Sequence, residues 1–276
     1  MSQMVRTLSE LTAEERSLAG GKGSTLARLA EAGHPVPEGL IILPAAFAGD
    51  ELTAGAWAQV QAHLSRLRRG VPDATFAVRS SALGLHSGLR EDSPRASFAG
   101  EFETVLEVGT DEAIRGAIHT VRRSRHSERV RAYSEAKGIE PLHDMAVVLQ
   151  RMVPADFSGV LFTADPVGGS RSQMVGNYVR GLGDKLVSGE AAPLEFSLAR
   201  PRGRYEGPAE LKPFARRLFK LGKRLEQELE CPQDLEWAVA GGKLYLLQSR
   251  PITTLLGFDP VTGEFNDSLT GDYVWN

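Results

Sequence analysis

Residues 232–251, PQDLEWAVAGGKLYLLQSRP, form two strand-like runs around a glycine pair and carry polar groups among apolar ones. Because side chains alternate along a strand, Asp234 and Glu236 on the first run and Gln248 and Arg250 on the second share one face of a hairpin. A carboxylate beside an amide oxygen suits a hard cation such as magnesium, and a guanidinium suits phosphate oxygens. The alternative is a surface ion pair between Glu236 and Arg250. The apolar flanking residues favour the metal and phosphate interpretation.

The turn of this hairpin decides how its polar groups meet. If Gly241, Gly242 and Lys243 form a three-residue loop, Glu236 faces Gln248 directly across the two strands. A two-residue turn makes them diagonal neighbours, which are still within reach of each other.

A second stretch, AGGKGST, combines glycines with Lys22 just before a helical pattern. Glycines let the backbone approach a ligand closely, and the start of a helix directs free N–H groups outward. Lys22 would add a positive charge for a phosphate. The stretch is not a Walker A loop, because Gly23 follows the lysine where Ser or Thr is required. The alternative is a flexible turn with a solvated lysine.

Three further positions are candidates for ligand contacts. Arg79 ends an apolar strand and precedes two serines, a common place for ligand groups, although it could equally point to solvent or pair with an acid. Gly100 and Thr104 flank the start of another strand. Gln150 lies inside an apolar strand, where a buried amide needs partners, and the backbone of a neighbouring strand would supply them.

The composition bounds the class of protein. The chain has 276 residues, 42% of them apolar and 24% charged, which is ordinary for a globular protein. A net charge of −3 gives no basic balance that would indicate nucleic-acid binding. Cys231 is the single cysteine, so no internal disulfide forms. The sequence contains no apolar run of membrane-spanning length and no signal peptide, which predicts a cytoplasmic protein that binds no membrane.

Hydrophobic periodicity predicts a mixed architecture of helices and strands. A glycine-rich turn before residue 24 is expected to lead into the first helix, which ends at Gly33. Further helices are expected over residues 45–70, 111–138 and 209–229, the last ending before Pro232. Strands are expected over 39–43, 75–83, 100–108, 145–153, 158–166 and at both ends of 174–198, with a polar loop over 85–97.

Together these stretches resemble the nucleotide-binding domain shared by phosphoenolpyruvate synthase, pyruvate phosphate dikinase and rifampicin phosphotransferase. The resemblance rests on GGKGSTLARLAEAGHPVPEGLII, VRSSA, ASFAGEFETVL, SGVLFTADP, GLGDKLVSG and PQDLEWAV with LYLLQSRPITT, in this order. It implies the α+β ATP-grasp fold, in which two lobes hold ATP in the cleft between them. The expected division is a first lobe over 1–140, a second over 141–256 and a linker over 257–276.

The resemblance also implies a role for each candidate residue. Lys22 and Arg79 would grip the ATP phosphates and stabilise charge during transfer. Gly100 and Thr104 would belong to the loop over the phosphates, and Gln150 would lie near the adenine. Glu236 and Gln248 would ligate Mg2+, and Arg250 would bind phosphate. These roles agree with the physical demands of phosphoryl transfer, which are positioning and charge neutralisation.

Several features depart from the family pattern. The loop after Arg79 carries a few extra residues, the stretches 47–75 and 198–211 are short, and Asp184 stands where the family usually has Glu. Relatives pass the phosphoryl group through a histidine on a swivelling domain to an acceptor-binding domain. The sequence contains no TSHAA-like motif, so these partners are expected in the parent chain or in trans, and residues 257–276 resemble the linker toward them.

The leading hypothesis is therefore the Mg-ATP module of a phosphoenolpyruvate synthase-like dikinase, an ATP-dependent phosphotransferase with paired acceptors. One alternative is the ATP module of a rifampicin phosphotransferase-like, antibiotic-modifying enzyme. A second is a non-catalytic, regulatory ATP-binding module, against which the retained polar residues argue. A small-molecule ligase of the wider ATP-grasp type would need its own acceptor pocket, for which the chain is expected to be too short.

Overall fold

The computed structural model describes residues 4–83, 92–93, 96–97, 103–128, 144–183 and 192–252. They form two compact units: the first holds the described residues up to 153 together with 245–248, and the second holds those from 154 to 244 together with 249–252. Within the described residues, no helix is both long enough and apolar enough to cross a membrane. The expected lobe boundary at 140/141 would place strand Met145–Arg151 in the second lobe, whereas this strand pairs within the first sheet. The linker over 257–276 lies outside the described residues and stays a prediction.

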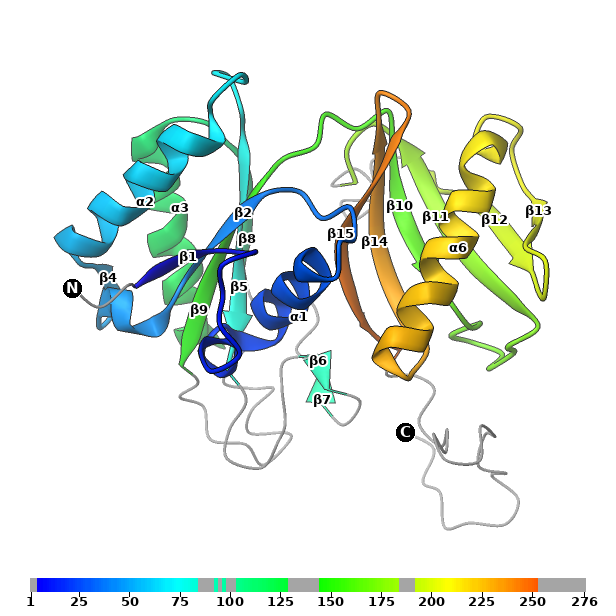
Figure 1. The fold of residues 1–276 in the computed structure, drawn as a ribbon, viewed down its shortest axis with the longest axis horizontal. Coiled ribbons are helices and arrows are strands. Elements are labelled where there is room, and N and C mark those ends of the chain that lie inside the picture. Colours follow the sequence, from blue (N-terminus) through cyan, green and yellow to red (C-terminus); the bar gives the residue numbers. More distant parts are fainter. Residues whose placement is uncertain are drawn as a thin grey trace, which may run out of the picture. The chain divides into compact units, whose positions relative to one another are not determined.

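The first unit is built on a five-stranded sheet in the order β1-β2-β9-β5-β8, in which all neighbouring strands are antiparallel. Its strands are β1 (Val5–Thr7), β2 (Gly39–Ile42), β9 (Met145–Arg151), β5 (Phe76–Ala82) and β8 (Thr104–Val108). Both faces are covered: α1 (Gly20–Glu31) packs on one, and α2 (Ala54–Leu67) and α3 (Asp111–Arg123) on the other (Figure 1). Coverage on both faces explains why β2 and β9 read as continuous apolar runs.

Local capping explains where the helices of the first unit begin. Thr53 accepts a hydrogen bond from the backbone N–H of Ala56, and Thr110 does the same for Ala113, so α2 and α3 start at side-chain caps. The helix expected over 45–70 is therefore shorter than predicted. The residues before it form η2 (Pro44–Ala46) and a small hairpin of β3 (Phe47–Ala48) and β4 (Glu51–Leu52). Gly49 has a φ of 66° in the turn of that hairpin, a conformation that interrupts a helix.

Other short elements also refine the sequence-based picture of the first unit. A 3-10 turn, η1 (Glu15–Leu18), precedes α1. The helix expected over 111–138 ends as α3 at residue 123 and passes into η3 (Ser124–His126). The remainder of that stretch, over 129–138, lies outside the described residues. Within the expected polar loop, β6 (Asp92–Ser93) and β7 (Ala96–Ser97) pair as a short hairpin.

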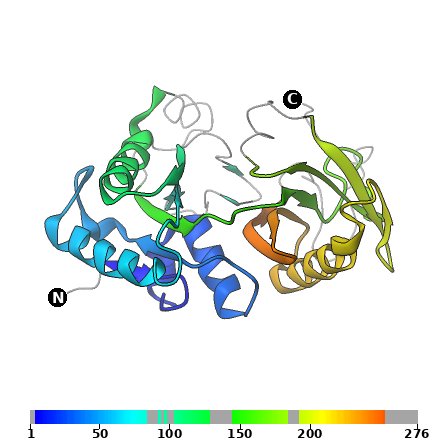
Figure 2. The same ribbon diagram turned by 90° about the horizontal axis from the view of Figure 1, so that it is seen from above.

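The second unit is built on a six-stranded sheet in the order β13-β12-β11-β10-β14-β15. Its strands are β10 (Phe157–Phe162), β11 (Gln173–Arg180), β12 (Leu194–Ala199), β13 (Arg204–Glu206), β14 (Gln233–Ala240) and β15 (Lys243–Pro251). The helix α6 (Lys212–Leu229) lies along one face of this sheet (Figure 2). It approaches closely at Gly222, where an added Cβ would lie 3.0 Å from the Met174 sulfur and 3.4 Å from a Leu161 methyl carbon. The opposite face carries the polar side chains of β14.

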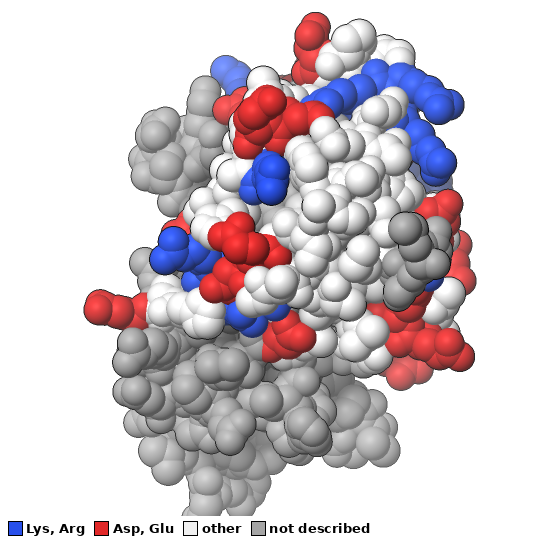
Figure 3. All heavy atoms as spheres, turned by 90° about the vertical axis from the view of Figure 1, so that its left-hand side faces the viewer, with Lys and Arg blue, Asp and Glu red and all other residues white. Residues whose placement is uncertain are grey.

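Charged groups of both signs are scattered over the side of the first unit that Figure 3 shows. Lys and Arg side chains lie close to Asp and Glu side chains in small mixed groups, and uncharged surface separates these groups from one another. This distribution agrees with the small net charge of −3.

Candidate nucleotide-binding site

The glycine-rich stretch is the first turn of a helix rather than the expected turn before one. Helix α1 starts at Gly20, so Lys22 lies within its first turn and is half-buried. Gly20 has a φ of 68°, and a Cβ at this position would lie 2.2 Å from the backbone oxygen of Ser81. The glycine therefore supplies both the left-handed backbone and the close approach of helix and strand that bring Lys22 to the sheet.

Ser81 supplies the cap that the helix lacks in its own sequence. Ala19 precedes α1 and offers no side-chain acceptor. The hydroxyl of Ser81, fully buried in β5, donates to the backbone oxygen of Ala19 at 2.7 Å and accepts from the N–H of Gly23 at 2.9 Å. The first N–H groups of a helix have no partner within the helix, so this hydroxyl satisfies one of them from a neighbouring element. Ser81 thus fixes the turn bearing Lys22 to the strand bearing Arg79.

Sheet register places the other first-unit candidates on the face that α1 covers. Arg79 pairs with Val148 and with Thr104, and Gln150 lies two residues after Val148 on β9. Val148 packs in the cluster that includes α1. Residues opposite each other, or two apart on one strand, point to the same face. The structure therefore brings Lys22, Arg79, Thr104 and Gln150 to one side of the first sheet, and their roles stay predictions.

Arg79 contacts a residue that is distant in sequence. Its Nη1 donates to Oε1 of Gln248 at 3.2 Å, and the Gln248 side chain is 6% exposed. Both residues belong to the first unit, because residues 245–248 of β15 pack with it. The backbone N–H of Leu246 donates to the oxygen of Pro35 at 2.9 Å and holds this segment there. An amide oxygen has two lone pairs, so Oε1 retains acceptor capacity beside the guanidinium.

Gln150 is a buried amide with spare donor capacity. It is 2% exposed, and its Nε2 has no hydrogen-bond partner among the described residues. The backbone of a neighbouring strand, the local alternative, therefore does not satisfy this nitrogen. Buried polar groups without partners are uncommon and costly, so such a group calls for an explanation, and a ligand acceptor is one.

The hairpin of the second unit has the shorter of the two possible turns. Gly241 and Gly242 have φ values of 54° and 73° and connect β14 to β15 as a two-residue turn, which favours glycine at both positions. Arg250 has an acidic partner on β14 other than the one that the surface ion-pair alternative names. Arg250 pairs with Asp234, with Nε and Nη2 at 2.8 and 2.7 Å from the same carboxylate oxygen. Arg250 is thereby held in place by a carboxylate that is itself nearly buried.

Glu236 is half-buried on β14, opposite Val160 of β10, and alternation puts it on the same face as Asp234. The strand that carries Gln248, β15, is the neighbour of β14 in the sheet. Among the described residues, no group of three or more His, Cys, Asp and Glu could hold a metal. The assignment of Glu236 and Gln248 as magnesium ligands stays a prediction.

Two residues of the sequence analysis cannot be placed. Gly100 and Asp184 lie outside the described residues, so their roles stay predictions. Two further residues, Ser81 and Asp234, hold the candidate site residues in place, and the sequence patterns gave neither of them a role. Ser81 is one of the two hydroxyls after Arg79, and its strand position gives no hint that it reaches the backbone of residues 19 and 23. Asp234 stood in the hairpin pattern without a role, and its pairing with Arg250 depends on the register of the turn.

The two units of mixed helix and sheet are consistent with the α+β ATP-grasp fold that the sequence predicts. The family model described as "Pyruvate phosphate dikinase, AMP/ATP-binding domain" matches residues 45–210 and 205–257. Because this match covers more than half of the chain, the protein belongs to that family.

Curated relatives carry several different names. A probable phosphoenolpyruvate synthase of Methanothermobacter thermautotrophicus is 30% identical over 329 aligned residues, covering 92% of this chain and 47% of the relative. A rifampicin phosphotransferase of Streptomyces sviceus is 37% identical over 218 residues, covering 68% of this chain and 24% of the relative. Serratia marcescens PigC, named a prodigiosin synthesizing transferase, is 30% identical over 287 residues, covering 85% of this chain and 31% of the relative. The chain thus spans half or less of the length of these relatives.

Among solved structures, D-alanyl-alanine synthetase A from Vibrio cholerae is similar with a TM-score of 0.44 and 11% identity, covering 86% of this chain and 57% of that one. PH1788 from Pyrococcus horikoshii gives a TM-score of 0.45 at 14% identity, covering 83% and 88% of the two chains.

Proposed function

We propose that this chain binds Mg-ATP and transfers a phosphoryl group to a histidine on a separate swivelling domain, as the ATP module of a phosphoenolpyruvate synthase-like dikinase. The observation that carries the proposal is the gathering of Lys22, Arg79, Thr104 and Gln150 on one face of the first sheet. Two cations, a hydroxyl and a buried amide are the groups that a triphosphate and a purine base require.

Some of these residues would bind ATP, and others would stabilise the charge that develops during transfer. The unpartnered Nε2 of Gln150 would donate to a ring nitrogen of adenine, which accepts hydrogen bonds. Lys22 and Arg79 would hold phosphate oxygens as negative charge shifts to the leaving group. Arg250, oriented by Asp234, would bind phosphate within the second unit. A magnesium ion on Glu236 and Gln248 would neutralise phosphate charge.

The transfer itself needs no covalent bond to this chain. A ring nitrogen of the acceptor histidine attacks a phosphorus atom of ATP, a P–N bond forms, and the P–O bond to the leaving group breaks with its electron pair on oxygen. The ring proton passes to solvent. In a dikinase, a second phosphoryl group goes to another acceptor. The names of the relatives support a phosphotransferase. The histidine domain and the acceptor-binding domain would come from the parent chain or act in trans, and the chain would work in the cytoplasm.

Magnesium dependence and the two cations test this proposal. Calorimetry of the whole chain should show ATP binding that weakens when EDTA removes magnesium and in Glu236→Ala. Lys22→Ala and Arg79→Ala should slow the transfer of label from ATP to a supplied histidine domain by about 100-fold. The matched controls are Lys220→Ala and Arg216→Ala, which remove exposed cations from α6. Unchanged transfer in both site variants, or equal ATP affinity with and without magnesium, would overturn the assignments.

The similarity to rifampicin phosphotransferases supports a second candidate, the ATP module of an antibiotic-modifying enzyme. The two candidates share every step up to the phosphohistidine and differ in the final acceptor. Supplying the histidine and acceptor domains with either pyruvate or rifampicin and detecting the phosphorylated product by mass spectrometry separates them. A chain that binds ATP but never phosphorylates the histidine would instead be a regulatory module.

A further inference from the structure

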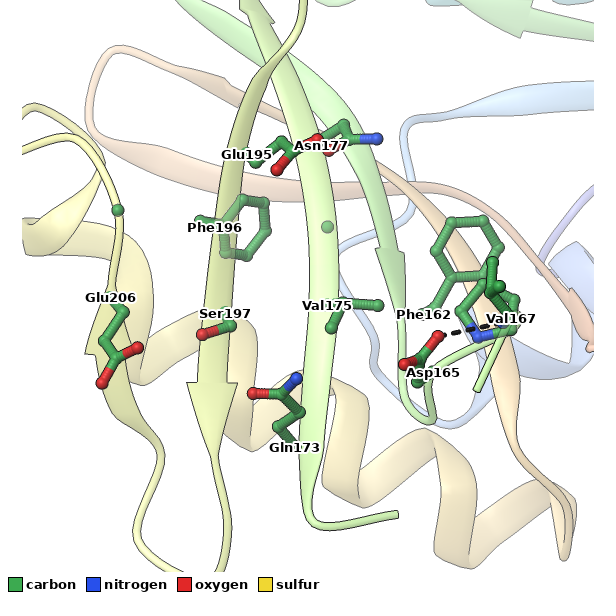
Figure 4. Close-up of a pocket in the computed structure, with 13 residues that line it drawn as sticks. Phe162, Asp165, Val167, Gln173, Val175, Asn177, Glu195, Phe196, Ser197 and Glu206 are labelled. Carbon is green, nitrogen blue, oxygen red and sulfur yellow. Dashed lines mark hydrogen bonds between the residues drawn. The ribbon is translucent and has the colours of Figure 1, made fainter. Parts of the chain in front are cut away.

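A hollow of about 560 Å³ opens on the face of the second sheet that α6 does not cover. It lies over β10 to β13, and Figure 4 shows its side chains on these adjoining strands. Apolar groups form part of its wall, among them Phe162 and Val175, and Val167 at the rim is 96% exposed. An apolar side chain so exposed at the edge of a concave surface is suited to contact with another molecule.

Sheet register connects the hollow to the polar face of β14. Val160 lies opposite Glu236 on one side and opposite Asn177 on the other, and Asn177 lies opposite Glu195. Asn177 and Glu195 line the hollow. Strands are roughly 4.8 Å apart, so Asn177 is two strands, or about 10 Å, from Glu236. An occupant of the hollow is therefore a neighbour of the proposed magnesium ligand.

A second set of residues that lie opposite one another on β11, β10 and β14 also links the hollow to the polar face of β14. Phe162 lies opposite Asp234, the partner of Arg250, and opposite Val175 on its other side. Phe162 and Val175 both line the hollow, which thus begins one strand away from the ion pair.

The electrostatics of the hollow disfavour phosphate and favour a cation. Three carboxylates line it, those of Asp165, Glu195 and Glu206, and no lysine or arginine is among its described lining residues. Asp165 accepts the N–H groups of its own turn, and Arg204 pairs with Glu206 from outside the lining at 2.8 Å. Negative charge remains in excess, so the triphosphate would be repelled from this side of the sheet.

We propose that this hollow docks a positively charged, partly apolar segment of the protein that carries the phosphoryl-accepting histidine. The inference rests on the proposed function, because the acceptor must approach the face of the sheet that bears Glu236 and Arg250. Lysine and arginine side chains combine an aliphatic stem with a charged head, which matches apolar walls with carboxylates at the rim. The surface would guide the acceptor through complementary charge and leave ATP binding to other residues.

The first test uses the whole chain and a fluorescein-labelled hexalysine peptide, with hexaglutamate as the charge-reversed control. Anisotropy should show hexalysine binding that weakens with added salt. The double variant Glu195→Gln/Glu206→Gln should bind roughly tenfold more weakly. The double variant Glu112→Gln/Glu230→Gln loses the same charge from exposed positions outside the lining and should bind as the wild type does.

A second variant tests the hollow without removing a carboxylate. Ser197→Arg places a cation in the lining and should abolish hexalysine binding while calorimetric ATP affinity stays within twofold of the wild type. With a supplied histidine domain, the variant should raise the KM for that domain and leave kcat unchanged.

The outcomes separate this inference from the proposed function. Failure of the wild-type chain to bind hexalysine, equal binding of both peptides, or equal weakening in the two double variants overturns the docking surface. If ATP binds and the histidine is phosphorylated in those cases, the proposed function stands. If ATP does not bind the wild type, the proposed function fails whatever the peptides do.

Discussion

Arg79 donates from Nη1 to Oε1 of Gln248 across 3.2 Å, although 169 positions separate them in sequence. One residue lies on β5 of the first sheet, and the other lies on β15 near the end of the described chain. The contact gives the guanidinium a defined position in the chain without ligand. It also gives a proposed metal-binding oxygen a cationic neighbour, so ligand binding must rearrange or share this bond.

The Gln248→Ala variant should separate the stability of the chain from ligand binding. The lost bond is a single side-chain interaction, so the free energy of unfolding should fall by only about 1 kcal/mol. Magnesium-dependent ATP affinity should fall much further. Gln61→Ala, which removes an exposed amide from α2 that bonds to Asp111, is the control. Urea denaturation and calorimetry measure the two effects, and parallel losses in both variants would contradict the role of Gln248.

Ser81→Ala should destabilise the chain through the first turn of α1. It leaves the buried oxygen of Ala19 and the N–H of Gly23 without this partner, at a cost of about 1–3 kcal/mol. Ser65→Ala removes a hydroxyl that bonds to Gln61 on an exposed surface and should change stability by less than about 0.5 kcal/mol. Equal midpoints in urea for the two variants would show that the cap is unimportant.

Gly20 and Gly33 form a matched pair for the close approach of helix and strand. Both have positive φ, 68° and 77°, but an added Cβ meets the Ser81 backbone only at Gly20, whereas nothing lies within 4 Å at Gly33. Gly33→Ala should therefore cost about 1 kcal/mol of backbone strain, and Gly20→Ala about 3 kcal/mol or more. Thermal unfolding measures both, and similar melting temperatures would contradict the packing described.

Gln150→Leu should have opposite effects on stability and on binding. The variant removes a buried nitrogen that has no partner among the described residues, so the unliganded chain should be as stable as the wild type or more so. ATP affinity should fall about tenfold, because a hydrogen bond to the base is lost. Urea denaturation without nucleotide and calorimetry with ATP report the two quantities. A large loss of stability with unchanged affinity would identify Gln150 as a structural residue.

Acid should destabilise the first unit partly through Asp111. Hydrogen bonds from Arg68, and then from Gln61, hold the pKa of this carboxyl below its usual value. Since the folded pKa is depressed, its stabilising contribution is complete above the unfolded pKa of about 3.9 and is lost as pH falls through the folded pKa. Asp111→Asn should flatten the decline in melting temperature below about pH 4. An unaltered decline would exclude this group as a contributor.

Much of the fold can be predicted from the sequence because burial leaves strong patterns. Strand β9 is apolar from Met145 to Leu149 because helices cover both faces of its sheet. Helix α6 has a clear apolar stripe, and Glu230, with a φ of 59°, closes the helix before Pro232. The start of α1 could not be predicted. Glycines normally weaken a helix, and the compensating cap comes from Ser81, more than fifty residues away.

In the candidate site too, features that depend on neighbouring residues can be predicted from the sequence, and contacts between distant residues cannot. The alternation of polar residues on the hairpin predicts a shared face, and the glycine pair predicts a tight turn. The sequence suggests Glu236 as the acidic partner in the ion-pair alternative, whereas Arg250 pairs with Asp234, because a shared face alone does not select between two acids on one strand. The contact between Arg79 and Gln248 depends on how residues 245–248 pack with the first unit, which no local pattern encodes.

Residues 245–248 make the first unit discontinuous, since its last segment follows nearly all of the second unit along the chain. A fragment that stops at residue 153 therefore loses the Gln248 partner of Arg79 and the Leu246 bond to Pro35. A gene fragment that ends at residue 153 would encode an incomplete unit. In that fragment Arg79 lacks the Gln248 amide, and the backbone oxygen of Pro35 lacks the N–H of Leu246. A deletion variant that joins residue 153 to residues 245–248 through a short linker would be the way to isolate that unit.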